Sequence, residues 1–247
     1  MFTLGGRTAK DLGLIMLRSA QRPVLPGTRD SSVSVPGRPG AYDFGGELGP
    51  REFELECGII AANRGELQNI VRNLAAHLLD SRGRPRTMEL IFDIEPDRHC
   101  TVRYSGDLPI ERIIRTGRLT LPLIAHDPFA YDNDETVFDQ VMNDEDILTA
   151  TGSGNIAAMP VVEITALEAT SGIIMNVGLG EIRYLKTLQA GEVLTVDAMR
   201  YQATVNGANA LNDVDTDWPV LYPGDNLVTY RGSVAARVTI THRGRWT

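Results

Sequence analysis

The chain has 247 residues, of which 43% are hydrophobic, and it carries a formal net charge of −8. This length and composition suffice for two ordinary domains or one large β domain with a buried core. The first residues lack the basic-then-apolar pattern of a signal peptide, and the longest early apolar run, residues 14–17, is far too short to span a bilayer. Signal-peptide secretion and membrane insertion are therefore not expected.

The charges are unevenly distributed along the chain. Residues 1–118 hold 17 Lys and Arg against 15 Asp and Glu, whereas residues 119–247 hold 7 against 17. An acidic half offers few cations to displace the counterions of a phosphate backbone. The charge pattern therefore argues against sequence-specific binding of nucleic acid.

A segment rich in Gly and Pro, residues 35–51, precedes the first clear strand. Gly reaches positive φ without steric cost and Pro fixes φ near −65°, so such a segment reverses the backbone repeatedly. We expect a shaped loop that leads into a β assembly.

Strict alternation of apolar and polar residues follows over residues 52–60, which is the period of a half-buried strand. The same period recurs in residues 100–104, 119–125 and 234–240. Antiparallel β structure is therefore expected to dominate. In the first of these strands the apolar face holds Phe53, Leu55, Cys57 and Ile59, and the polar face holds Glu52, Glu54 and Glu56.

One segment breaks this pattern, because apolar residues recur at three- and four-residue spacing over residues 63–79. Asn63 is suited to cap the start of this helix, with Glu66 three residues later. Residues 81–85, which contain Gly83, end the helix and lead to a strand at residues 87–93. We expect a single helix that covers the apolar face of a sheet.

The second half is predicted to be a separate domain. Residues 141–155, acidic and then rich in Gly and Ser, read as a linker between an N-terminal domain, 1–140, and a C-terminal domain, 156–247. Short segments with strand character at intervals of roughly ten residues, separated by Gly turns, are typical of a small β-sandwich.

Two clusters invite a catalytic or metal-binding interpretation. Asp93, Glu95 and Asp97 are followed by His99, but neither the spacing of a calcium loop nor a zinc helix motif accompanies them. The pair His126 and Asp127 follows a strand, yet no Gly-x-Ser-x-Gly elbow or activated cysteine is present. We interpret both clusters as structural, and we predict no catalytic residue, no metal site, no cofactor and no enzymatic activity.

Three other features have competing interpretations. Gly178 and Gly180 lack the third glycine and the following helix of a dinucleotide fingerprint. Cys57 and Cys100 lie on separate predicted strands and are expected to be buried thiols, with a cross-strand disulfide as the alternative. The third feature is a set of aromatic residues, Trp218, Tyr222 and Trp246. They could form a platform that binds a sugar, or they could pack in the core.

Taken in order, these segments resemble the distal tail protein family of long-tailed, non-contractile bacteriophages and prophages. The resemblance rests on the order and spacing of several short motifs along nearly the whole chain, not on one diagnostic motif. These motifs include residues 35–45 and 51–59, the helix end at 74–79, residues 90–97, Asp-Pro-Phe-Ala-Tyr at 127–131, Met-Pro-Val-Val-Glu-Ile at 159–164, and Leu-Tyr-Pro-Gly-Asp-Asn at 221–226.

The resemblance implies a mainly β fold, with an N-terminal ring-forming domain that carries one helix and a C-terminal galectin-like β-sandwich. It also implies a homohexameric ring at the distal end of the tail, assembled in the host cytoplasm. Such a ring would join the tail-tube protein to a hub or fibre protein and leave a channel for DNA and the tape measure. Two alternatives remain: a carbohydrate-binding module that adheres to the host envelope, and a hydrolase that uses His126 and Asp127.

Overall fold

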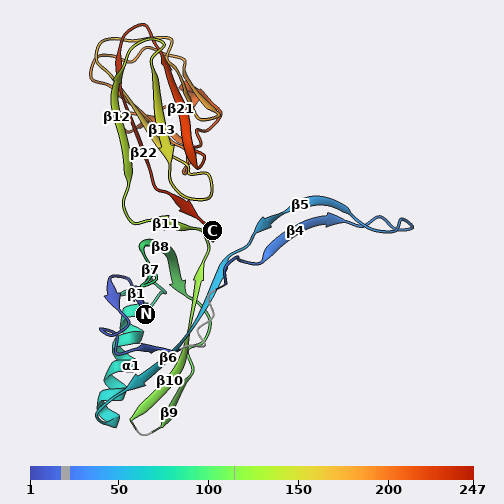
Figure 1. The fold of residues 1–247 in the computed structure, drawn as a ribbon, viewed down its shortest axis with the longest axis vertical. Helices are drawn as coiled ribbons and strands as arrows, with labels where there is room; N and C mark the ends of the chain where they lie inside the picture. The colour runs from blue at the N-terminus through green and yellow to red at the C-terminus, as the bar shows by residue number, and fades with distance from the viewer. Residues whose placement is uncertain (18–22, 114) are drawn as a thin grey trace. The chain divides into compact units, whose positions relative to one another are not determined.

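The computed structural model describes residues 1–17, 23–113 and 115–247, which form two compact units (Figure 1). The first unit comprises residues 1–130 together with Thr247, and the second comprises residues 131–246. Most elements are strands, and the described residues contain one α-helix. The predicted mainly β class is therefore confirmed.

The first unit is built on a curved antiparallel sheet with the strand order β2-β1-β7-β8-β10-β6-β3, and β9 pairs with β10. Its longest pairing joins β6 to β10 over ten residue pairs, from Arg51 opposite Ala125 to Ile60 opposite Thr116. The apolar face predicted for β6 is buried in the core of this unit. The strands are β1 (Phe2–Leu4), β2 (Arg7–Thr8), β3 (Ile15–Met16), β6 (Arg51–Ile60), β7 (Thr87–Phe92), β8 (Glu95–Tyr104), β9 (Ile110–Ile113) and β10 (Thr116–Ala125).

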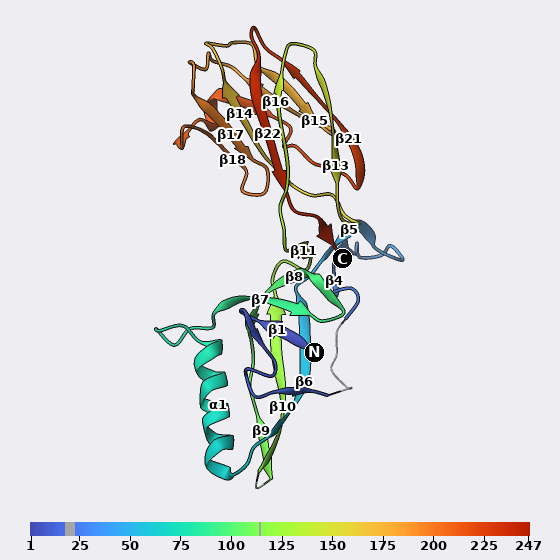
Figure 2. The ribbon, with the colours of Figure 1, turned by 60° about the vertical axis from the view of Figure 1, so that its left-hand side comes forward.

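The helix α1 (Arg64–Leu78) lies beside this sheet (Figure 2). As predicted, the side chain of Asn63 caps its first turn by accepting a hydrogen bond from Glu66 N at 2.9 Å. The Glu66 carboxylate accepts from Ala62 N at 2.6 Å, which completes the capping box one residue early. Leu67 and Leu74 are buried and join the core, so the apolar stripe read from the sequence is the face that packs.

The segment predicted to be a loop at residues 35–51 differs from that expectation. It contains β5 (Tyr42–Leu48), which pairs with β4 (Thr28–Val33) in a two-stranded sheet of its own (Figure 1). Every residue of β4 is exposed, and in β5 only Leu48 is partly buried. The expected shaped loop is therefore the tip of a hairpin, where the Gly and Pro residues turn the chain, and the residues after it form a strand.

The second unit is a β-sandwich of two antiparallel sheets, which face each other in Figure 2. One has the order β12-β22-β14-β17-β18-β19 and the other has the order β13-β21-β15-β16-β20, and buried side chains from both form a single core. The short strand β11 (Ala130–Asp132) pairs with β23 (Arg245–Trp246).

The strands of the first sheet are β12 (Thr136–Met142), β14 (Val161–Ala166), β17 (Val193–Asp197), β18 (Gln202–Val205), β19 (Ala208–Asn209) and β22 (Ala236–His242). Those of the second are β13 (Ile147–Gly152), β15 (Ile174–Val177), β16 (Gly180–Tyr184), β20 (Val214–Thr216) and β21 (Gly224–Arg231). A 3-10 turn, Leu211–Asp213, precedes β20.

Residues 141–155, predicted to be a linker, are largely part of this sandwich. They include the end of β12 and all of β13, which pairs with β21 over six residues. The acidic residues that suggested a linker form the turn between these strands, where Asp146 Oδ2 accepts from Asn143 N at 2.7 Å. Turn chemistry and linker chemistry use the same residue types, which explains the error.

A buried histidine makes the stability of the second unit dependent on pH. His242 is 3% exposed, neither ring nitrogen has a hydrogen-bond partner among the described residues, and its ring stacks on Phe138 at 5.9 Å between centroids. Burial lowers the pKa of His242 from its ordinary value of 6.5, although the Asp132 carboxylate opposes part of the shift. The unfolded chain therefore binds a proton more readily than the folded chain.

Because the folded-state pKa is lowered, this contribution to stability is present above pH 6.5 and is lost as the pH falls below it. We expect the unfolding free energy of the second unit to decrease between pH 7 and pH 5. Urea titrations monitored by tryptophan fluorescence measure this unit in the intact chain, because Trp218 and Trp246 are the only tryptophans. His242→Phe, which keeps an aromatic ring on Phe138, is expected to flatten the profile; an equally steep profile in that variant would assign the pH dependence to another group.

Candidate assembly surface

The tip of the β4–β5 hairpin is shaped by two Pro-Gly pairs. Arg38 N donates to the Val35 carbonyl at 3.1 Å, and Gly37 between them has a φ of 81°, as in a type II turn. Gly40 has a φ of 86° and turns the chain again. The Arg38 guanidinium then lies 4.3 Å from the centroid of the Tyr42 ring. The direction of the tip therefore depends on backbone conformations that glycine adopts readily.

The outer half of the hairpin carries exposed apolar side chains. Val33 lies opposite Tyr42, so these two residues share one face, and Ser32 lies opposite Asp43. Phe44 lies at a register shift, where Phe44 and Gly45 of β5 face the single residue Ser31 of β4. Phe44 is 69% exposed, Val33 52% and Tyr42 46%, although the Arg38 guanidinium stacks on the Tyr42 ring. We call these three residues the apolar patch of the hairpin.

An arginine fastens the base of the hairpin. The Arg51 guanidinium donates to the Pro23 carbonyl at 2.7 and 3.1 Å, to the Val24 carbonyl at 3.0 Å and to the Pro128 carbonyl at 3.4 Å. The planar fork thus joins the segment that precedes β4 to the Asp-Pro-Phe turn after β10, a geometry that lysine cannot reproduce. The direction of the hairpin is set at the base as well as at the tip.

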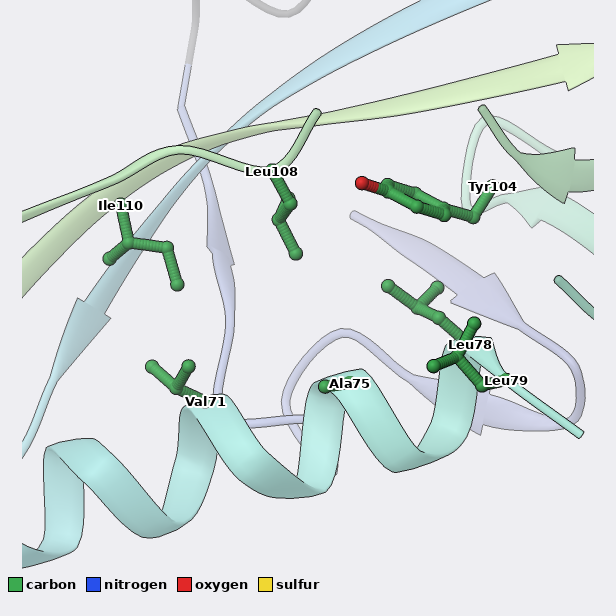
Figure 3. Close-up of a pocket in the computed structure, with 7 residues that line it drawn as sticks. All are labelled: Val71, Ala75, Leu78, Leu79, Tyr104, Leu108 and Ile110. Carbon is green, nitrogen blue, oxygen red and sulfur yellow. The ribbon is translucent and has the colours of Figure 1, made fainter. Parts of the chain in front are cut away.

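A recess lies between α1 and the chain that leads into β9, and among the residues that line it Ala75 alone is exposed. Side chains from the two sides point toward one another around a cavity of about 360 Å³ (Figure 3). Its lining is apolar apart from one tyrosine hydroxyl and contains no charged side chain. It consists of Val71, Ala75, Leu78, Leu79, Tyr104, Leu108 and Ile110. We call this surface the α1 groove.

The acidic cluster after β7 is occupied by structural contacts. Asp93 Oδ2 lies 3.3 Å from the N-terminal nitrogen, and Glu95 and Asp97 lie 3.5 and 3.8 Å from the Arg98 guanidinium. Among the described residues, no three His, Cys, Asp or Glu side chains come together in a way that could hold a metal ion. His99 is buried at 8% exposure.

The contacts of His126 and Asp127 suit a structural role. The Nε2 atom of His126 lies 3.2 Å from Nε and 3.0 Å from Nη2 of Arg103, and Asp127 accepts a hydrogen bond from Phe129 N at 3.3 Å. A general base needs a ring nitrogen free to take a proton from a nucleophile. Here a guanidinium donates to that nitrogen, so the geometry favours the structural interpretation.

Cys57 and Cys100 are both buried and free, and burial raises the pKa of the Cys57 thiol to about 12.

Gly178 and Gly180 lie in the hairpin that joins β15 to β16, so a strand follows them and not a helix. None of the helices in the described ranges is long and apolar enough to cross a membrane.

The three aromatic residues considered for a sugar platform have different surroundings. Trp246 donates from Nε1 to Asp132 Oδ1 at 2.7 Å, Trp218 packs against the sandwich core, and Tyr222 is 46% exposed. The Trp218 ring meets Tyr201 edge-on, with 5.3 Å between centroids. Tyr201 also lines a shallow cavity of about 250 Å³ with Gln202, Ala203, Thr204, Gly207, Asn209 and Leu211.

Three residues of the candidate surface, Tyr42, Phe44 and Arg51, were not predicted from the sequence. Phe44 and Tyr42 alternate with polar residues, which is a strand signal, but Gly and Pro surround them. No pattern in the sequence around Arg51 indicated its role. The role depends on three carbonyl groups that lie far from Arg51 in the sequence, and their positions are known only from the structure.

Two family models match the chain, and each falls within one compact unit. A model described as the phage tail protein RIFT-related domain matches residues 7–125, and one described as the siphovirus-type tail component, C-terminal domain, matches residues 153–246. Together with the two β units, these matches define a phage tail component. More particularly, the chain belongs to the family of siphophage distal tail proteins.

The Dit protein of phage SPP1 shares the fold of this chain. The crystal structure of the Dit protein of phage SPP1, described as a paradigm of the hub adsorption apparatus in phages that infect Gram-positive bacteria, superposes with a TM-score of 0.75 at 14% identity, covering 98% of this chain and 99% of that chain. A chain of the phage p2 baseplate in its activated conformation with strontium gives a TM-score of 0.41 at 10% identity, with 93% and 90% covered. No curated protein sequence matches significantly.

Proposed function

We propose that six copies of this chain form a ring at the distal end of the tail, which joins the tail tube to a hub or fibre protein. The observation that carries the proposal is the hairpin from Thr28 to Leu48, whose strands are exposed almost throughout. An isolated two-stranded ribbon is at best marginally stable in water, so a ribbon of this length needs a partner surface. Closed cyclic assembly supplies one to every copy.

The role of such a ring is geometric and not catalytic. It holds its neighbours in place and leaves an opening through which DNA and the tape measure protein pass. The acidic second half, with 7 basic against 17 acidic residues over 119–247, gives passing DNA few cations to bind. The virion location at the tail tip and assembly in the host cytoplasm follow from the same proposal.

Light scattering on the purified chain, alone and mixed with tail-tube and hub proteins, tests the number of copies. A mass close to six times the 27.0 kDa of one chain is expected, either alone or in the mixture. The mixture matters because some rings form only on a partner. A mass of one chain under every condition would contradict the proposal.

Substituting Gly37 and Gly40 together by valine is expected to reduce the hexamer fraction by roughly tenfold or more. Both residues have positive φ, and a left-handed conformation costs a β-branched residue about 1–2 kcal/mol. An added Cβ meets no atom within 4 Å at either position, so the effect would come from a redirected tip and not from a clash. Light scattering gives the hexamer fraction.

Gly27→Val is the matched control, because this glycine lies near the base of the hairpin, is exposed, has no positive φ and has open space at its Cβ. It should assemble like the unmodified chain. If the variant with valine at both Gly37 and Gly40 assembles normally, the tip of the hairpin only connects the two strands and does not contribute to assembly.

A carbohydrate-binding role at the host envelope is the second candidate, and the shallow cavity beside Tyr201 favours it. An exposed aromatic ring next to amide and hydroxyl groups suits a sugar. Tyr201 supplies the ring, and Gln202, Thr204 and Asn209 supply those groups. This role predicts saturable binding of the chain to purified host cell wall and its loss on Tyr201→Ala or Trp218→Ala. Unchanged binding in both variants, or no binding at all, would reject it.

A further inference from the structure

We propose that strand β13, at an open edge of the sandwich, receives an additional strand from another tail protein. β13 pairs with β21 alone, and its backbone hydrogen bonds reach no other element of the second unit, all of whose residues the structure describes. In an antiparallel pair, alternate residues direct their N–H and C=O groups away from the partner strand. One side of β13 therefore presents backbone groups to a further strand. This inference goes beyond the proposed ring and does not depend on the number of copies in it.

The other three edges of the sandwich carry features that discourage strand addition. β19 has only two residues, and β20 has three, with the exposed Asp215 at its centre. β12 is longer, but Asp139 lies in its middle. β13 has six residues without a charge or a proline, and its register with β21 is unbroken. A long, regular and uncharged edge is the kind that pairs with a strand of another chain.

The surroundings of β13 indicate the chemistry of the added strand. The turn before β13 is acidic, because Asp144 and Glu145 are exposed and Asp146 is half-buried, while Arg231 pairs with Glu145. A Lys or Arg in the added strand would be attracted to this turn. Along β13 itself, uncharged and β-branched residues suit its exposed Thr side chains. The partner is therefore an extended, uncharged segment with a basic residue at one end.

The strands of this chain match that description poorly. In an antiparallel pair of two β13 strands, the acidic turn of one copy would meet the end of β13 in the other, where residues 153–155 carry no charge. The hairpin strands β4 and β5 are also exposed, but they contain Asp30 and Asp43 and have a register shift. The charge pattern therefore favours a strand of a different tail protein over a second copy.

Hydrogen–deuterium exchange of the full chain tests the edge directly. The chain is measured alone at low and high concentration, mixed with the tail-tube protein, and mixed with the hub protein. In one of the two mixtures, exchange of the amides of β13 that face away from β21 is expected to slow roughly tenfold or more, because they gain protein hydrogen bonds. The amides of β20, at the opposite edge of the same sheet, should exchange at the same rate throughout.

Two results would overturn the proposal. The first is unchanged exchange of β13 in both mixtures. The second is slower exchange of β13 in the chain alone at high concentration, which would assign the edge to a second copy.

Two lysine variants separate addition at the edge from binding to the outer face of the sheet. Thr149→Lys places a charge on β13 and is expected to raise the Kd of the protecting partner at least about tenfold. Leu227→Lys places the same charge on β21, opposite Thr149 and away from the edge, and should leave the Kd nearly unchanged. Equal losses would show binding to the face and overturn strand addition. Urea titrations monitored by tryptophan fluorescence check that both variants fold.

The mass of the unmodified chain is measured in the same samples by light scattering. Protection of β13 without hexamers would overturn the proposed ring and support the added strand. Hexamers without protection of β13 would do the reverse.

Discussion

Replacing Asn226 by alanine is expected to lower the unfolding free energy of the second unit by about 3 kcal/mol. The Asn226 side chain is buried and accepts from Tyr222 N at 2.9 Å, while its amide nitrogen lies 2.8 Å from the Tyr222 carbonyl oxygen, 2.9 Å from that of Gly224 and 3.3 Å from that of Ala150. Alanine would remove all four hydrogen bonds, of which the one to the Ala150 carbonyl is buried and the others are partly buried. Urea unfolding followed by tryptophan fluorescence measures the change.

Two further variants separate hydrogen bonding from packing. Asn226→Asp keeps the shape of the side chain and can accept a hydrogen bond from Tyr222 N, but its carboxylate would face three carbonyl oxygens. A similar loss of unfolding free energy is therefore expected at pH 7. Part of this loss should be recovered in acid, because the protonated carboxyl group can donate a hydrogen bond. Asn176→Ala removes a single hydrogen bond, to Thr229 Oγ1 at 3.0 Å, and should cost about 1 kcal/mol. Equal losses at Asn226 and Asn176 would contradict this account of the turn.

Replacing Gly154 by alanine is expected to destabilise the same unit by about 4 kcal/mol, because two costs coincide. Gly154 has a φ of 104°, a conformation that L side chains rarely adopt, and a Cβ there would collide with the backbone of Arg245. A backbone collision cannot be relieved by a rotamer change. The same fluorescence-monitored titration applies.

Gly172→Ala is the control, since Gly172 has a φ of 66° but open space at its Cβ. It isolates the conformational cost, which should be about 1–2 kcal/mol. If Gly154→Ala and Gly172→Ala lower the unfolding free energy equally, the collision with the Arg245 backbone would not contribute to the cost of Gly154→Ala.

The spacing of apolar residues predicted much of the core of each unit. A strand or helix that is buried on one face places its apolar residues at a regular interval, and this interval is visible in the sequence. The strand from Arg51 to Ile60 and the helix from Arg64 to Leu78 follow their patterns within one residue at each end. The mainly β class and the tail family were likewise accessible from the order of short motifs. What these elements share is that local sequence and tertiary packing favour the same structure.

The hairpin and the strand within residues 141–155 were not predicted for a common reason, because turn residues surround each strand. In the hairpin, Gly and Pro residues flank and interrupt the strand from Tyr42 to Leu48, and a register shift between Asp30 and Ser32 breaks the alternation. At 141–155, acidic and Gly-rich turn residues concealed the strand from Ile147 to Gly152. The Arg51 contacts and the α1 groove depend on segments far apart in sequence, so no local pattern announces them.

The most direct test of the central claim is electron microscopy of the purified chain, imaged alone and together with the tail-tube and hub proteins. We expect class averages that show a six-fold ring with an open centre, stacked against tube rings in the mixture. Particles of single copies, or clusters without six-fold symmetry and without an opening under both conditions, would contradict the ring.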